Sequence, residues 1–190
     1  MTIWDTVEEP LYAHIDVARK LVAGHREAAL KRVGLASHDG RTKVGLLSAF
    51  DKRRLQIARA IVVAPFLVIV DEPLRRLDAF AQAIVLELLS DLRRLDGPAL
   101  LVVTADMRIA YALADDLMVF KDTKPVERGP ILEVMRAPKH GETKRLLTAA
   151  FPLYRIGGAA ERPARPADTV RRSEPIGAKP GEIAAIGASG

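Results

Sequence analysis

The sequence predicts an α/β fold built around a parallel sheet. Three apolar stretches of strand length, at 66–70, 99–104 and 117–120, are separated by helical patterns at 78–95 and 106–115. Strands that alternate with helices at this spacing favour a parallel sheet with right-handed crossovers. The first stretch, FLVIV, is almost uninterrupted in its apolar character, which is typical of a strand covered on both faces.

The N-terminal part is predicted to be helical. Residues 15–33 carry apolar side chains at helical spacing, and Gly34 is placed to end that helix. Ser48 is a good N-cap for a second helix over 50–63, which Pro65 stops. The sequence therefore places a helical region before the first strand.

The chain continues beyond the third strand with a short polar segment and two more helices. Residues 124–129 predict an exposed fourth strand, and helical patterns follow near 130–136 and 141–150. Residues 154–190 are rich in Pro, Gly, Ala and charge, and we interpret them as a flexible linker or tail. The globular part is thus expected within 1–153.

Composition narrows the class of protein. The 190 residues are 49% hydrophobic and include no cysteine, which fits a globular protein in a reducing compartment. No apolar run is long enough to span a membrane and no signal peptide is recognisable, so we expect a cytoplasmic protein. The net charge of +5 is spread along the chain, which favours a solvated basic surface over a nucleic-acid interface.

Two adjacent carboxylates follow the first strand. Asp71 and Glu72 come directly after FLVIV and precede Pro73. Ligands of α/β sheets bind beyond the carboxyl ends of the strands, where Asp71 could hold Mg²⁺ through water and Glu72 could orient an attacking water. The alternative is that the pair only caps a turn.

The order of several motifs resembles the second half of an ATP-binding cassette, the ATPase subunit of ABC transporters. A segment similar to the family signature precedes a basic helix, an Asp-Glu-Pro sequence ends the Walker B strand, and a D-loop follows. These motifs are Leu47-Ser48-Ala49-Phe50-Asp51, the helix through Ile57–Ala60, Asp71-Glu72-Pro73 and Leu77-Asp78. The order and spacing carry the resemblance, since each short motif alone is weak.

The resemblance implies a partial P-loop ATPase core with a helical subdomain, covering about residues 1–153. Residues 1–60 are similar to the helical subdomain and 61–153 to the Walker B half of the core, as in oligopeptide and dipeptide importers. It implies ATP and Mg²⁺ as cofactors, with Asp71 on the metal through water and Glu72 on the attacking water. It also implies membrane-embedded permease subunits and a second ATPase subunit as partners, so that the chain would lie at the inner face of the cell membrane.

The sequence departs from the family pattern at the phosphate end. No Gly-Lys dipeptide of a phosphate-binding loop and no Q-loop occur in these 190 residues. Ala49 and Phe50 replace the signature glycines, and Ala105 stands where the family has its switch histidine. Arg75 and Arg76 occupy D-loop positions that are usually small or polar.

These departures predict a degenerate cassette, a pseudoenzyme that does not hydrolyse ATP alone. In the family, the segment that contains Ser48 acts in trans on the ATP of a partner, and a large ring at Phe50 would stand where the phosphate lies. The alternative is a non-catalytic scaffold or a decayed fragment with no role in transport.

The end of the chain has a pattern of its own. KPGEIAAIGASG, residues 179–190, is similar to the run into a phosphate loop: a glycine turn, an apolar strand, then Gly187, Ser189 and Gly190. This segment is either the start of a truncated second cassette or a chance match in a glycine-rich tail.

Overall fold

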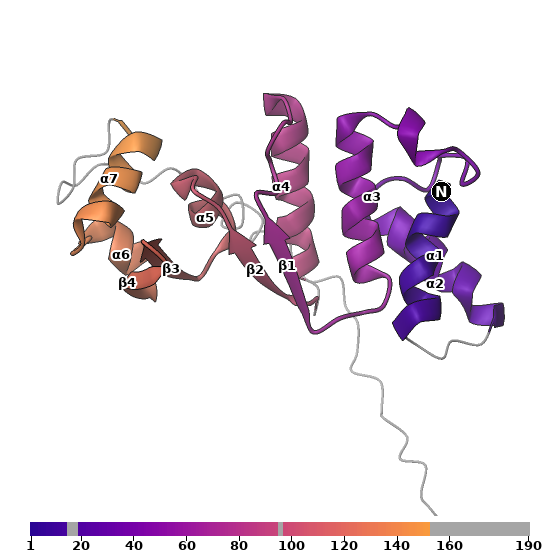
Figure 1. The fold of residues 1–190 in the computed structure, drawn as a ribbon, viewed down its shortest axis with the longest axis horizontal. Coiled ribbons are helices and arrows are strands. Elements are labelled where there is room, and N and C mark those ends of the chain that lie inside the picture. The colour runs from indigo at the N-terminus through magenta and orange to yellow at the C-terminus, as the bar shows by residue number, and fades with distance from the viewer. Residues whose placement is uncertain (15–18, 95–96, 153–190) are drawn as a thin grey trace, which may run out of the picture.

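The computed structural model describes residues 1–14, 19–94 and 97–152 (Figure 1). Helices gather at one end, a small sheet with its helix lies in the middle, and the C-terminal elements form the other end. The elements, in chain order, are α1 (Ile3–His14), α2 (Arg19–Arg32), the 3-10 turn η1 (Val44–Leu46), α3 (Ala49–Ile61), β1 (Leu67–Asp71), α4 (Ala79–Arg94), β2 (Ala99–Val103), α5 (Met107–Leu113), β3 (Asp116–Lys121), β4 (Lys124–Pro130), α6 (Ile131–Arg136) and α7 (Gly141–Ala150).

The first helix, α1, was not predicted from the apolar pattern. Its start carries a capping box: the amide of Asp5 donates to Thr2 Oγ1 at 3.2 Å, and the amide of Thr2 donates to Asp5 Oδ2 at 2.8 Å. Pro10 lies inside the helix and removes one backbone donor there. The Thr-x-x-Asp sequence was the signal that could have located this helix.

The three N-terminal helices pack around a closed core. Ile3, Val7 and Leu11 recur at every fourth position of α1 and are completely buried. The predicted C-cap of α2 is confirmed, because Gly34 has a φ of +71° and Leu35 N–H donates to Leu30 O at 2.9 Å in a Schellman arrangement. The first residues of the helix predicted over 15–33 lie outside the described part of the chain.

The strands β1 and β2 form a parallel pair with α4 against one face (Figure 1). Val68 is buried, whereas Leu67 and Ile69 on the other face of β1 are 49% and 62% exposed. On β2, Leu101 and Val103 are each 50% exposed. The expectation that this sheet is covered on both faces is therefore wrong for the described residues: one face is packed and one is open.

We had expected the third strand to join that parallel sheet, but it does not. Instead, β3 pairs antiparallel with β4 in a separate two-stranded sheet. A tight turn makes this pairing local, since Asp122 and Thr123 have φ values of +48° and +65°, as a two-residue hairpin requires. The polar, exposed fourth strand and the two closing helices are confirmed.

The C-terminal elements have their own apolar cluster. Its buried members come from α5, α6 and α7, and they are Met107, Ala110, Tyr111, Ile131, Met135 and Leu147. Within the described residues, no helix is both long enough and apolar enough to cross a membrane.

Candidate functional site

The acidic pair lies at the carboxyl end of β1, as predicted. Asp71 is the last residue of the strand and its side chain is exposed on the open face, with no hydrogen-bond partner among the described residues. Glu72 continues the ladder, because its amide donates to Val103 O at 2.9 Å. Its φ of +44° is rare for a residue with a side chain, and such strain concentrates at functional sites.

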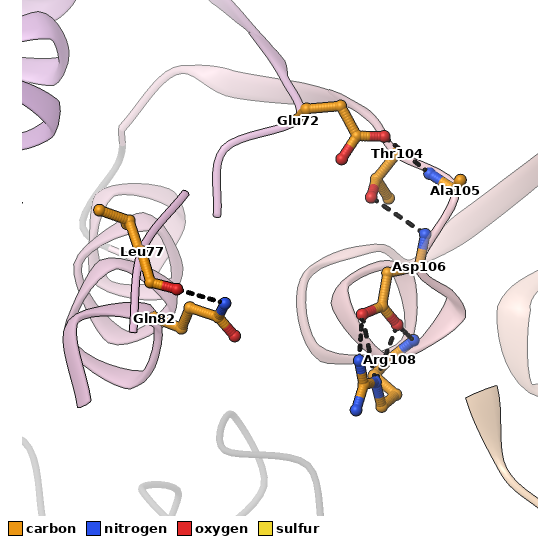
Figure 2. A network of polar contacts seen from close by, with 7 residues as sticks. All are labelled: Glu72, Leu77, Gln82, Thr104, Ala105, Asp106 and Arg108. Atoms are coloured by element: carbon orange, nitrogen blue, oxygen red, sulfur yellow. Dashed lines mark hydrogen bonds and ion pairs between the residues drawn. The ribbon is translucent and has the colours of Figure 1, made fainter. Parts of the chain in front are cut away.

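The carboxylate of Glu72 is bonded to the loop that follows β2. Its Oε1 accepts a hydrogen bond from the amide of Ala105 at 3.0 Å, as Figure 2 shows. This contact brings Glu72 next to the residue at the switch position, which sequence reasoning had not predicted. Ala105 contributes only its backbone, so it offers no side-chain donor or acceptor to a ligand.

Hydrogen bonds among residues 104–108 hold the start of α5. The amide of Asp106 donates to Thr104 Oγ1 at 3.1 Å, and Asp106 caps the helix by accepting from the amide of Arg108 at 2.8 Å. The guanidinium of Arg108 also reaches Asp106 Oδ2 at 2.6 Å (Figure 2). The hydrogen bonds from Arg108 outweigh burial and hold the pKa of Asp106 below its ordinary value.

Sequence reasoning missed the roles of Thr104, Asp106 and Arg108. The signal was available, since an Asp directly before a short helical pattern is a typical N-cap. For the site, this means that the guanidinium of Arg108 is already paired with the carboxylate of Asp106.

A second loop, residues 73–78, leads from the acidic pair into α4. Asp78 caps this helix, because its Oδ1 accepts from the amide of Ala81 at 2.9 Å. Gln82 Nε2 donates to Leu77 O at 2.9 Å and ties the loop to the helix (Figure 2). Arg76 has a φ of +64° and is exposed. The helix start predicted at Asp78 is confirmed.

The signature-like segment lies elsewhere, at the start of α3. Ser48 caps this helix as predicted: its Oγ accepts from the amide of Asp51 at 3.0 Å and donates to Asp51 Oδ2 at 2.8 Å. Burial opposes the charge of Asp51, but hydrogen bonds from Arg54 and Ser48 outweigh it and hold the pKa of that carboxyl below its ordinary value. Leu47 is buried and Ala49 is exposed.

The ring of Phe50 turns toward the core of the helical region. It is half-buried, packs against the first core cluster, and lies 4.3 Å below the guanidinium of Arg54. Arg54 in turn donates to Gly34 O at 3.0 Å and to Asp51 Oδ1 at 2.5 Å. The contact with Arg54 and the packing against the core fix the position of this ring, and its expected place near a phosphate stays a prediction.

No hydrogen bond or ion pair within the described residues joins this segment to the acidic pair. The structure brings Glu72 and Ala105 into contact, while Asp71 ends β1 and Asp78 caps α4. It leaves Ser48 and its neighbours as a separate group at α3.

The acidic end of the sheet offers part of the ligand set that a phosphate-bound Mg²⁺ ion needs. Within the described residues, no cluster of three or more His, Cys, Asp and Glu side chains could hold a metal. Mg²⁺ in phosphate sites needs only one or two carboxylates and keeps several waters, and the free carboxylate of Asp71 suits that role. The remaining ligands would have to come from phosphate and water.

The chain resembles known proteins over most of its length. It is 37% identical over 160 residues to the Peptidoglycan transport ATP-binding protein YejF of Agrobacterium fabrum, covering 82% of this chain and 29% of that protein. It is 33% identical to a candidate peptide import ATP-binding protein of Brucella melitensis, covering 96% of this chain and 52% of the relative. The chain thus spans about half or less of the length of these relatives. No protein-family model matches it.

The fold of the chain is similar to that of solved structures of ATP-binding cassettes. An inward-facing candidate metal-chelate type ABC transporter matches with a TM-score of 0.66 at 24% identity, over 80% of this chain and 58% of that one. A dimeric ATP-binding cassette in a post-hydrolysis state, bound to ADP and Pi, matches with a TM-score of 0.59 at 25% identity, over 69% of this chain and 57% of that one.

The fold and the acidic strand end define a P-loop nucleotide hydrolase core, represented here in part. Within that class, the chain belongs to the ATP-binding cassette ATPases of ABC transporters, and its curated relatives are named for peptide and peptidoglycan import.

Proposed function

We propose that this chain acts as an ATP-binding-cassette-like subunit of a peptide-type ABC transporter and does not hydrolyse ATP alone. The observation that carries the proposal is the contact between Glu72 Oε1 and the amide of Ala105. It keeps the acidic residue and the switch position adjacent, while Ala105 has no side chain to bind a phosphate. The metal end of the site is retained and the phosphate end is altered.

The proposed roles follow from the family. Asp71 would hold Mg²⁺ through water, Glu72 would orient the attacking water, and Ser48 would act on ATP held by a second ATPase subunit. The Oγ of Ser48 already bonds to Asp51 in both directions, which supports a weakened role in trans.

The proposed organisation assigns residues 1–60 to the helical subdomain and 61–153 to the Walker B half of the core. The helical subdomain would dock on membrane-embedded permease subunits, so that the protein lies at the cytoplasmic face of the membrane. The buried apolar side chains of α1–α3 support a packed helical region, whose apolar cluster continues into β1 and α4. Residues 154–190 would act as a linker.

Calorimetry with Mg²⁺-ATP tests the degenerate phosphate end. We expect no saturable heat on the purified chain at millimolar ATP, because the chain contains no Gly-Lys phosphate-loop sequence. Glu72→Gln serves as the companion in an ATPase assay, where both proteins should be equally inactive. Saturable binding that disappears in Asp71→Asn, or turnover that Glu72→Gln abolishes, would refute the proposal.

A second experiment separates a transport subunit from a scaffold without a transport role. The chain is mixed with a complete peptide-type cassette ATPase, and the ATPase rate of that partner is measured. We expect the rate to change with the amount of chain and to respond to Ser48→Ala. No change at saturating chain would favour the scaffold.

A further inference from the structure

The hydroxyl of Ser48 has its only hydrogen committed to a neighbouring carboxylate. A serine hydroxyl donates one hydrogen bond and accepts up to two. Ser48 is exposed, and its Oγ donates to Asp51 Oδ2 at 2.8 Å and accepts from the amide of Asp51 at 3.0 Å. A ligand that reaches the start of α3 from solvent therefore meets a hydroxyl whose donor is already used. Ser48 can donate to a phosphate oxygen only after this contact breaks.

The carboxylate of Asp51 is fixed from three directions. Besides the bond from Ser48, Asp51 Oδ1 accepts from Arg54 at 2.5 Å, and His38 Nε2 lies 3.8 Å from Asp51 Oδ2. Arg54 is itself held, because it donates to Gly34 O at 3.0 Å. Only 18% of the Asp51 side chain is exposed. The contact with Ser48 thus belongs to a connected network and not to a freely turning side chain.

Asp51 also places a negative charge in the first turn of α3. The amides at a helix N-terminus favour a negative group, and here the chain itself supplies it. Burial opposes the charge, but hydrogen bonds from Arg54 and Ser48 outweigh it and hold the pKa of Asp51 below its ordinary value. The carboxylate is therefore ionised at neutral pH and repels a second anion that approaches the same amides.

We propose that Asp51 is a positioning residue that keeps Ser48 from contacting a phosphate. It takes the hydrogen of the hydroxyl and supplies the negative group that the start of α3 would otherwise accept from a ligand. Removal of its charge should release both the hydroxyl and the guanidinium of Arg54 for a phosphate. The consequence for ATP held by a second ATPase subunit rests on the proposed function of Ser48, whereas the effect on free phosphate does not.

NMR spectra of the full chain with inorganic phosphate test the proposal directly. The amide shifts of Ala49 and Phe50 are followed as phosphate is added to the unmodified protein, to Asp51→Asn and to Asp51→Ala. We expect both variants to bind phosphate at this segment at least about ten-fold more tightly than the unmodified protein, because a like charge has been removed. Asp51→Asn retains an oxygen that can accept from Ser48, so this variant keeps the helix cap.

Two further variants separate this effect from net charge and from the helix cap. Glu142→Gln changes the net charge by the same amount, and Glu142 also lies in the first turn of its helix and pairs with an arginine three residues later. It should leave the phosphate response of Ala49 unchanged. Adding Ser48→Ala to Asp51→Asn should remove most of the gain in affinity, because the hydroxyl is then absent.

Two results would overturn the proposal. Equal phosphate affinity of the unmodified protein and of both Asp51 variants would show that this carboxylate only caps α3. An equal gain of affinity in Glu142→Gln would show that net charge is the cause.

The effect on a second subunit is measured separately. The unmodified chain and Asp51→Asn are each mixed with a complete peptide-type cassette ATPase, and the two ATPase rates are compared. We expect Asp51→Asn to alter the rate more strongly than the unmodified chain does. A gain in phosphate affinity without any change in this rate would support the role of Asp51 and refute the proposed function of Ser48 in trans.

Discussion

The helical region α1–α3 buries its apolar side chains more completely than the sheet β1–β2 does. Leu11 and Leu55 in the helical region are at most 1% exposed, while Leu101 and Ile69 in the sheet are 50% and 62% exposed. Ion pairs such as Arg59–Glu9 add to the ties between α1 and α3. Three amphipathic helices can bury their apolar stripes on one another, whereas a sheet has two faces and α4 covers one.

The largest expected difference compares the same substitution in the two regions. Leu55→Ala should lower the free energy of unfolding by about 3 kcal/mol, because it leaves a cavity in a closed core. Leu101→Ala should cost about 1 kcal/mol or less, because half of that side chain is already in water. Urea denaturation of both variants measures the difference. Equal losses would show that the sheet face is covered in solution.

The next prediction concerns Phe50, which links the signature-like segment to the helical core. Phe50→Gly should lower the free energy of unfolding by about 2 kcal/mol, because the ring leaves the core and glycine enters the first turn of α3. Phe50→Leu is the matched control and should retain most of the stability. If Phe50→Gly were neutral in thermal unfolding, the ring would have no packing role.

A set of hydrogen bonds links β4 to the start of α7 in the C-terminal part of the described chain. Glu127 on β4 accepts hydrogen bonds from the amides of Lys139 and His140 at 2.8 and 2.9 Å and from the buried hydroxyl of Thr143 at 2.6 Å. Burial opposes ionisation, but these donors outweigh it, so the pKa of Glu127 lies below its ordinary value.

The stability that Glu127 contributes should therefore depend on pH. A carboxylate whose folded pKa is depressed stabilises the fold above its unfolded pKa, and the contribution is lost as the pH falls through the folded pKa. Glu127→Gln should cost about 1–2 kcal/mol at pH 7. The cost should shrink below about pH 4. Denaturation at both pH values measures this, and a cost independent of pH would contradict the assignment.

The smallest effect on stability is expected at the open face. Ile69→Lys should change the free energy of unfolding by about 0.5 kcal/mol or less, since the side chain is 62% exposed. It should nevertheless raise the protein concentration at which light scattering detects association, because it places a charge in an apolar patch. The matched control is Gln56→Lys, on an exposed position of α3. Equal effects of both substitutions would mean that net charge alone matters.

The sequence predicted the elements better than their assembly. The strand that ends at Asp71, the cap at Ser48 and the turn at Gly34 were predictable, because each depends on neighbouring residues only. The capping box of Thr2 and Asp5 was equally local but was not recognised in the sequence.

Pairing between distant segments was less predictable. The apolar pattern of 117–120 is the same whether the strand joins a parallel sheet or a hairpin, so it did not reveal the partner of β3. The same limit applied to the site. The contact between Glu72 and Ala105 joins residues that are 33 positions apart and was not predicted, and the position of the Phe50 ring depends on Arg54, one helical turn away.

The turn at Asp122 and Thr123 has a consequence for the order in which the chain folds. It joins β3 to β4 with almost no intervening chain, and isolated hairpins close in about 1–10 microseconds. The pairing of Leu67 with Ala99 must wait until α4 and its connections have been ordered, so its loop-closure entropy is greater. The C-terminal hairpin should thus be an early native structure, and the sheet that carries the acidic pair a late one.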